Sequence, residues 1–506
     1  MTHGGRSPRH PAMDTRSLPG GPGRSRRTRR LAVGCLLAAL TAFSVGACRE
    51  TARPEASGLA GPGLRVSYDE RGDLRPESRG ARDQILAAAA EATDVVVFSH
   101  GWWNDESTAE CRYRQVIDGL KARKPAALGP DFRPVLVGIY WPSAVFPVAP
   151  GDCESDASLL EGGTAPVTGD ALRARLEAWA RAAFPGATSR ATFGAEVTRL
   201  TELLEKERNG SPLTREEGAT VVAILFGWRD AGRRPEDGAP PSDVPGEPVF
   251  GGSPAAVAAR WQPARTPTPG GGASEAGGGG AAVPSRFIDW ANVFTVWTMK
   301  ERAGIVGSRG VYDLLGGLQA GRARGLRIHL VGHSFGGKLL SAAITGHGRG
   351  PAHVVDSFVI VQGAFSHFAF SSAEEIRALG VTTPRGGLYA SVLGARGITG
   401  PLVVTYSGFD TPNAVFYPWA FGLVRDMLEA DEVPRYGALG ANGLKGPRVR
   451  TLNLATERLG DGAVPDASRL VSVNASGVIQ GHADFVKTPV FDLIWDAIVA
   501  GRQPPR

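Results

Sequence analysis

The stretch LVGHSFGGKLL, residues 330–340, constrains the fold of this chain more than any other segment. From Gly332 to Gly336 it reads G-x-S-x-G, a motif in which a serine stands on a sharp turn between a β-strand and an α-helix. The serine backbone is strained there, and the residues two positions to either side must be small to avoid the adjoining strand and helix. The motif therefore predicts that Ser334 is raised above the end of a sheet.

The same stretch also contains most of a phosphate-binding loop. From Gly332 to Lys338 it reads G-x-x-x-x-G-K, but that loop continues with Ser or Thr, whose hydroxyl binds magnesium. Leu339 occupies that position here and has no atom that can ligate a metal. No metal-ligand cluster and no dinucleotide motif is visible in the sequence, so we predict no nucleotide, no metal and no other cofactor.

Apolar runs rich in β-branched residues alternate with helix-length segments along the chain. The runs lie at 93–103, 133–143, 326–332, 354–364, 400–408, 449–455 and 469–475, and the segments at 108–122, 308–322, 414–428 and 488–501. This alternation is typical of a parallel sheet covered on both faces. We therefore predict an α/β fold with a mostly parallel central sheet and helices on both faces.

Residues 155–300 interrupt this alternation with a helical insertion. Its segment 233–285 is rich in Gly and Pro and too poor in apolar residues to order itself. Aromatic residues at helical spacing follow, and they suit either core packing or a pocket wall: Phe287, Trp290, Phe294 and Trp297. The core is thus predicted in two parts, 83–154 and 301–506.

The first 47 residues predict an export signal. The basic stretch RSRRTRR, 24–30, precedes the uncharged run LAVGCLLAALTAFSVGA, which is short for a membrane span. The sequence VGAC at 45–48 resembles the bacterial lipobox, which predicts lipidation of Cys48. An uncleaved anchor or cleavage at a nearby bond is the alternative, and the paired arginines also permit a twin-arginine route.

The formal net charge of +6 depends on this leader, which holds eight arginines and one acidic residue. The remaining 48 basic and 49 acidic side chains nearly balance, so we expect no nucleic-acid partner. Residues 48–82 are rich in Gly, Arg and Pro and are expected to form a tether, although GLRVSYD at 63–69 is compatible with a strand.

Two cysteines, Cys111 and Cys153, remain beyond Cys48. They lie just beyond two strands expected to be near neighbours, and exported proteins form disulfides. We predict a Cys111–Cys153 bond, with two unpaired and partly buried thiols as the alternative.

A nucleophilic serine needs a base, and the base needs an orienting acid. His482, in SGVIQGHADF after the last predicted strand, is the candidate base, unless it is an exposed loop residue. Asp410, in LVVTYSGFDTPN, is the candidate acid, although an Asp at this place also suits the start of a helix. Asp461 and Asp466 are substitutes for the acid.

An acyl-transfer site also needs two backbone N–H groups for the oxyanion of its tetrahedral intermediate. The N–H of Phe335, directly after Ser334, is one candidate. The N–H of Trp102, in SHGWW at 99–103, is the other, unless His100 and Gly101 only turn the chain.

With these motifs the chain resembles the α/β-hydrolase superfamily, over about residues 93–154 and 301–501. The resemblance rests on the HG loop, the GHSFGG turn, and the order Ser, Asp, His along the chain. MKERAGIVGSRGVYDLL, at 299–315, is also similar to bacterial members. The resemblance implies that the insertion 155–300 is a cap above the strand ends, although its length departs from the family pattern.

The sequence thus predicts an exported, cell-envelope lipoprotein that is a serine hydrolase of the carboxylesterase or lipase kind. The nearby tryptophans weakly favour lipid-like or aryl ester substrates. The alternative is a membrane-anchored binding or scaffold protein on a catalytically dead hydrolase fold.

Overall fold

The computed structural model describes residues 63–102, 104–144, 168–231, 286–383, 385–393, 396–417, 436–460 and 469–503, excepting the side chains of 286–290, 292–293 and 415–416. All of these residues belong to one compact unit, Glu55–Arg506. The predicted signal 1–47, Cys48, Cys153 and the segment 233–285 lie outside the described residues.

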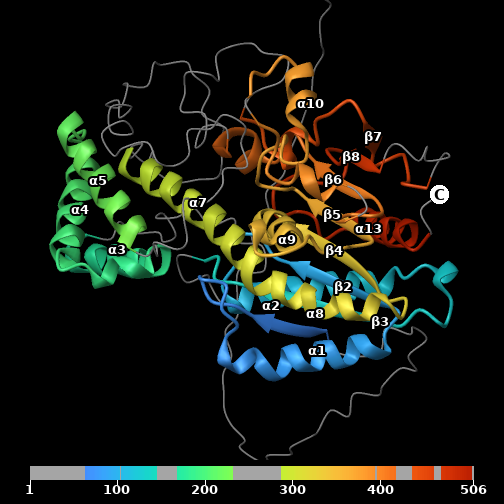
Figure 1. Cartoon of the computed structure of the whole chain (residues 1–506). Coiled ribbons are helices and arrows are strands. Elements are labelled where there is room, and N and C mark those ends of the chain that lie inside the picture. The colour runs from blue at the N-terminus through green and yellow to red at the C-terminus, as the bar shows by residue number, and fades with distance from the viewer. Residues whose placement is uncertain are drawn as a thin grey trace, which may run out of the picture. The chain divides into compact units, whose positions relative to one another are not determined.

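Eight strands form a single sheet within the described part of the chain (Figure 1). They are β1 Leu64–Ser67, β2 Asp94–Ser99, β3 Pro134–Tyr140, β4 Arg327–His333, β5 Ser357–Val361, β6 Leu402–Tyr406, β7 Val449–Asn453 and β8 Leu470–Asn474. Their order is β1-β3-β2-β4-β5-β6-β8-β7, and every neighbouring pair is parallel. The predicted α/β class is confirmed.

The helices bury both faces of this sheet. The longer ones are α1 Arg79–Glu91, α2 Glu106–Ala122, α3 Gly169–Ala183, α4 Phe193–Arg208, α5 Arg215–Ala231, α7 Arg286–Val306, α8 Tyr312–Arg322, α9 Phe335–Thr345 and α13 Thr488–Gly501. Two short ones are α10 Ala373–Ala378 and α12 Leu439–Asn442.

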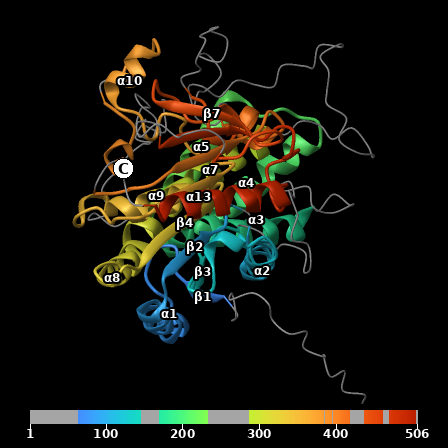
Figure 2. The same ribbon diagram turned by 90° about the vertical axis from the view of Figure 1, so that its right-hand side faces the viewer.

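Alternate residues of the central strands enter two different apolar cores, because successive side chains of a strand point to opposite faces. On β2, Val95 and Val97 pack in the core that includes residues of α1, α8 and α9, whereas Val96 and Phe98 pack with α2 and α13. Figure 2 shows α1 and α8 on one side of the strands and α2 on the other. Burial on both faces explains why these strands are continuous apolar runs.

The chain changes direction across the sheet at β2. From β2 it passes to β3 on one side, and after the insertion it returns to β4 on the other side of β2. Ligand sites in open α/β sheets lie at the carboxyl ends of the strands beside such a switch point. The loops after β2 and β4 therefore form the candidate site.

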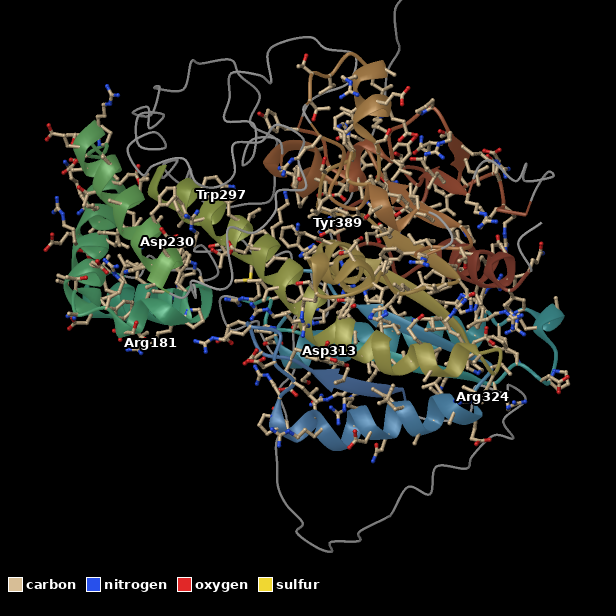
Figure 3. All side chains as sticks on the ribbon, viewed as in Figure 1. Arg181, Asp230, Trp297, Asp313, Arg324 and Tyr389 are labelled. Carbon is tan, nitrogen blue, oxygen red and sulfur yellow. The ribbon has the colours of Figure 1, made fainter. Side chains whose placement is uncertain are left out.

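Helices α3, α4 and α5 of the insertion share an aromatic core and contact α7 (Figure 1). The rings of Trp179 and Trp228 are 6.1 Å apart, and Trp179 donates a hydrogen bond to Thr295 of α7 at 3.2 Å. Figure 3 marks Trp297 farther along α7, where its buried ring lies 5.0 Å from that of Phe294. Both described residues of the predicted aromatic stripe therefore lie in the apolar core.

A buried arginine joins the insertion to the rest of the unit. Arg302 of α7 donates hydrogen bonds to the backbone oxygens of Pro142, after β3, and of Ala182 and Ala183, at the end of α3. Burial lowers the pKa of Arg302 to about 10, so the side chain stays charged at neutral pH. Its charge faces the negative end of the α3 dipole.

The structure departs from two predicted boundaries. β1 lies within the predicted tether and pairs with β3, so the folded unit begins before residue 83. The predicted helix 308–322 starts with a π-helical turn, Gly307–Val311, and continues as α8. A Cβ at Gly307 would lie 2.0 Å from the Leu339 backbone oxygen, so only glycine allows this close crossing with α9.

Candidate active site

Ser334 stands between β4 and α9 in a strained conformation, with φ 55° and ψ −125°. A Cβ at Gly332 would lie 2.6 Å from the Gly337 Cα, and one at Gly336 would lie 2.2 Å from the Ser99 backbone oxygen. Neither position has room for a side chain. The two glycines of the motif therefore allow the turn that places Ser334 at the carboxyl end of the sheet.

His482 reaches Ser334 from the loop that follows β8. Its Nε2 lies 2.8 Å from the Ser334 hydroxyl oxygen, which is hydrogen-bonding distance. The structure thus brings together the predicted nucleophile and base, 148 positions apart in the chain.

Asp410 lies behind His482, in the loop after β6, and is fully buried. Both of its carboxylate oxygens are 3.0 Å from Nδ1 of His482. A carboxylate accepts hydrogen bonds, so this contact favours the tautomer with the proton on Nδ1. Nε2 is then left without a proton and can accept one from Ser334.

The Asp410 carboxylate also accepts a hydrogen bond from the backbone N–H of Asn413 at 3.1 Å. The same residue therefore orients His482 and supports the π-helical turn Pro412–Phe416, so the two interpretations of Asp410 do not exclude each other. Asp461 and Asp466 lie outside the described residues.

Two amide side chains that the sequence interpretation missed complete the surroundings of Asp410. Gln362, directly after β5, donates from Nε2 to Oδ2 of Asp410 at 2.8 Å. Asn413 donates from Nδ2 to the same oxygen at 2.8 Å. Asn413 stands three positions from Asp410, a spacing that could have suggested a local contact. Nothing in the sequence points to Gln362, which is 48 positions away.

The predicted oxyanion loop lies directly against Ser334. A Cβ at Gly101 would be 2.5 Å from the Cβ of Ser334, so the two backbones meet at closer range than any side chain permits. The ring of the next residue, Trp102, lies 6.1 Å from the ring of Phe335, the first residue of α9. The first N–H groups of a helix have no partner within it, which suits Phe335 as a donor.

A buried polar network shapes this loop, and the sequence interpretation missed its members Asn104 and Ser143. Asn104 donates from Nδ2 to the backbone oxygens of Gly101 at 3.1 Å and Trp102 at 2.8 Å. The Ser143 hydroxyl lies 2.9 Å from the Gly101 oxygen and accepts the Asn104 N–H at 3.1 Å. The carbonyl groups are thus held by side chains, which sets the direction of the intervening N–H groups.

His100 belongs to the same loop. Its Nδ1 donates to the Gly101 oxygen at 2.9 Å, and its Nε2 accepts the N–H of Trp141 at 3.3 Å. Burial lowers its pKa to about 4, so the ring is neutral at neutral pH. Both ring nitrogens are used to hold the loop.

Side chains from two other elements also hydrogen-bond to the backbone at His482. His333, the residue before Ser334, donates from Nε2 to the His482 backbone oxygen at 2.9 Å. Arg112 of α2 donates to the next carbonyl, that of Ala483, at 3.3 Å. Burial, together with the nearby His482, keeps the pKa of His333 well below its ordinary value, so no second positive charge competes with a protonated His482.

The remaining sequence predictions concern cysteines, metals and the membrane. Cys111 is disulfide-bonded, with its partner outside the described ranges, so its pairing with Cys153 stays a prediction. In the part of the chain that the structure covers, no group of three or more His, Cys, Asp or Glu could hold a metal ion. Among the same residues, no helix has the length and apolar character needed to cross a membrane.

Comparisons with protein-family models, with curated proteins and with solved structures find no match for this chain. The arrangement of its own residues therefore carries the functional argument.

Proposed function

We propose that this protein is a serine hydrolase of the α/β-hydrolase kind that cleaves carboxylic esters, with amides as the alternative substrate class, through an acyl-enzyme. The observation that carries the proposal is the continuous contact from the Ser334 hydroxyl to Nε2 of His482, at 2.8 Å, and from Nδ1 to Asp410, at 3.0 Å. A nucleophile within reach of a base, which an acid orients in turn, is the arrangement that activates serine.

In the first half of the reaction, the Ser334 oxygen attacks the ester carbonyl carbon while its proton moves to Nε2 of His482. Asp410 stays ionised and stabilises the imidazolium, since Nδ1 keeps its proton. The imidazolium then gives the Nε2 proton to the leaving alcohol, and the acyl group remains on Ser334. Water repeats the sequence in the second half and releases the acid.

The oxyanion of each tetrahedral intermediate needs donors that are already in place. We assign this role to the backbone N–H groups of Phe335 and Trp102, which flank Ser334 from α9 and from the loop after β2. The positive end of the α9 dipole adds to this stabilisation.

The substrate class and the location are part of the proposal. The half-buried ring of Trp102, next to the Gly101 backbone that contacts Ser334, favours lipid-like or aryl esters, for which apolar contacts supply binding energy. The basic, apolar and VGAC segments of the leader support an exported protein that is anchored to the cell envelope through a lipid on Cys48. The helical insertion 155–300 is proposed to be a cap over the site.

A fluorophosphonate probe tests the mechanism without knowledge of the substrate, because it reacts only with an activated serine. Ser334→Ala should abolish labelling, and His482→Ala should slow it by several orders of magnitude. In ester hydrolysis, each single variant should lose several orders of magnitude in kcat and the double variant should lose little more, because nucleophile and base act as one unit.

The chain offers a matched control in a second Ser-His-Asp set at the opposite end of the strands. The Ser357 hydroxyl lies 2.8 Å from Nδ1 of His329, whose Nε2 lies 3.0 Å from Asp94, and all three side chains are buried. Ser357→Ala should leave labelling unchanged, since no reagent reaches a fully buried hydroxyl. Absence of labelling in the parent protein would contradict the hydrolase proposal and favour the anchored scaffold.

A further inference from the structure

Gln362 has a backbone conformation that residues other than glycine rarely adopt. Its φ is 49°, although it is not glycine, and its side chain is fully buried. Such strain costs about 1–3 kcal/mol and persists only where surrounding contacts enforce it. The contacts of Gln362 therefore indicate what the strain achieves.

Every polar group of the Gln362 side chain has a partner. Nε2 donates to Asp410 at 2.8 Å, and Oε1 accepts a hydrogen bond from the hydroxyl of Thr405, on β6, at 3.1 Å. The same hydroxyl accepts the backbone N–H of Gln362 at 3.1 Å. The amide presents its NH2 group to Asp410 because a carboxylate accepts hydrogen bonds, and its oxygen is then left to accept from Thr405.

Asn413 holds the same carboxylate oxygen from the other side. Its Nδ2 lies 2.8 Å from Oδ2 of Asp410 and 3.1 Å from the backbone oxygen of Gln362, so it joins the two residues. A Cβ at Gly440 would lie 2.2 Å from Nδ2 of Asn413 and 2.9 Å from Oδ2 of Asp410. The backbone of α12 thus closes the remaining side of the network.

We infer that Gln362 and Asn413 are positioning residues that hold the Asp410 carboxylate in place and aimed at His482. Removing a buried carboxylate from water disfavours its charge, unless donors replace the lost hydration. Here neutral amide donors occupy Oδ2 without adding a competing positive charge. The effect on catalysis rests on the proposed function. The protonation of the His482–Asp410 pair can be measured without any substrate.

The direction of the effect follows from the net charge of the pair. With His482 neutral, the pair carries a charge of −1, and with His482 protonated it is a neutral ion pair. A donor on Asp410 stabilises the negative state more, so removing it makes protonation easier. Loss of Gln362 should therefore raise the apparent pKa of the pair and move the acid limb of activity to higher pH.

Other ionisable groups face His482 and must stay the same in the test. His333 from β4 contacts the His482 backbone oxygen, Arg112 from α2 contacts the next carbonyl, and Asp484 and Lys487 form an ion pair farther along the same segment. None of them is altered by a substitution at Gln362, so a shift can be assigned to Asp410.

The experiment follows the imidazole nitrogen signals of His482 by NMR across pH in the full-length protein, together with the pH profile of fluorophosphonate labelling. Gln362→Leu removes the donor, and Gln362→Gly removes it while relieving the backbone strain, which protects folding. Both should raise the apparent pKa of the pair by about half a unit or more and slow labelling roughly tenfold. Gln362→Glu should raise the pKa further, because a second carboxylate faces Asp410.

Gln480→Leu is the control, since Gln480 lies on the His482 loop and its side chain donates to the Ser476 backbone oxygen at 2.7 Å. This variant should leave the apparent pKa of the His482–Asp410 pair unchanged. If folded Gln362→Gly titrates like the parent protein, Gln362 has only a structural role and the inference is overturned. If the parent protein shows no labelling while the titration still shifts, the proposed hydrolase function fails and the charge-holding role of Gln362 stands.

Discussion

The contact between Gly101 and Ser334 permits a direct test of how the site is assembled. Gly101→Ala adds one methyl group, whose ideal position is 2.5 Å from the Cβ of Ser334 and 3.0 Å from Nδ1 of His333. Carbon atoms pack at about 3.5–4.0 Å, so the loop and the turn must separate by roughly 1 Å or more. Both neighbouring groups are buried, and neither can swing away as the end of a flexible side chain would.

The expected cost falls on catalysis more than on stability. Overpacking of this kind destabilises by about 1–3 kcal/mol, which a protein of this size can tolerate. A displacement of about 1 Å between reacting groups can lower a rate roughly 100-fold. Gly101→Ala should therefore fold, and should react with a fluorophosphonate and turn over an activated aryl ester about 100 times more slowly, chiefly through kcat.

Gly408→Ala is the matched control, because Gly408 lies two residues from Asp410 and its added Cβ would only approach the Ser476 hydroxyl at 3.9 Å. This variant should keep parental rates. If Gly101→Ala also reacts within threefold of the parent protein, the close approach of the two backbones is not needed for the reaction, and the assignment of this loop to the oxyanion is refuted.

Three further predictions concern stability and the cell envelope. The pKa of His100 is lowered to about 4 in the folded protein, whereas a histidine in the unfolded chain titrates at about 6.5. As the pH falls below about 6.5, the unfolded chain therefore binds a proton that the folded protein does not. The free energy of unfolding should drop by about 2 kcal/mol between pH 6.5 and 5 from this residue alone. Urea unfolding at both pH values should show a smaller drop in His100→Gln, and an equal drop would contradict the assignment. Thiol labelling of the unfolded, unreduced protein should find neither Cys111 nor Cys153, whose bond would close about 43 residues and stabilise by ~4 kcal/mol; stoichiometric labelling of both would exclude it. Mass spectrometry should find a lipid on an N-terminal Cys48, and Cys48→Ser should release an active protein from membranes; an unmodified N-terminus beyond Cys48 would rule out the anchor.

Sequence patterns predicted the strands and the turn at Ser334, because neighbouring residues alone determine these elements. The strand before Ser334 is an apolar run, the turn needs small residues on both sides, and the helix follows directly, so the whole unit is contained within 327–345. The parallel sheet was predictable for a similar reason, since burial on both faces makes each strand continuously apolar.

The partners of Ser334 were predictable only as candidates. The sequence showed that His482 and Asp410 follow strands, and parallel strands bring their carboxyl ends to one edge of the sheet. The sequence left Asp410, Asp461 and Asp466 as alternative candidates for the acid, because the residues around a loop carboxylate do not indicate which side chain it contacts. The strand order, which sets β6 next to β8, decides that Asp410 reaches His482.

Only the tertiary structure revealed Gln362 and the network of Asn104 and Ser143 behind the loop that is proposed to bind the oxyanion. Gln362 reaches Asp410 across 48 positions and Asn104 reaches Ser143 across 39, and an amide or hydroxyl side chain has no pattern in the sequence that indicates its acceptor. Periodicity records which face of an element is buried, because burial affects many residues at once. A single buried hydrogen bond affects two residues, and only the folded backbone determines which two they are.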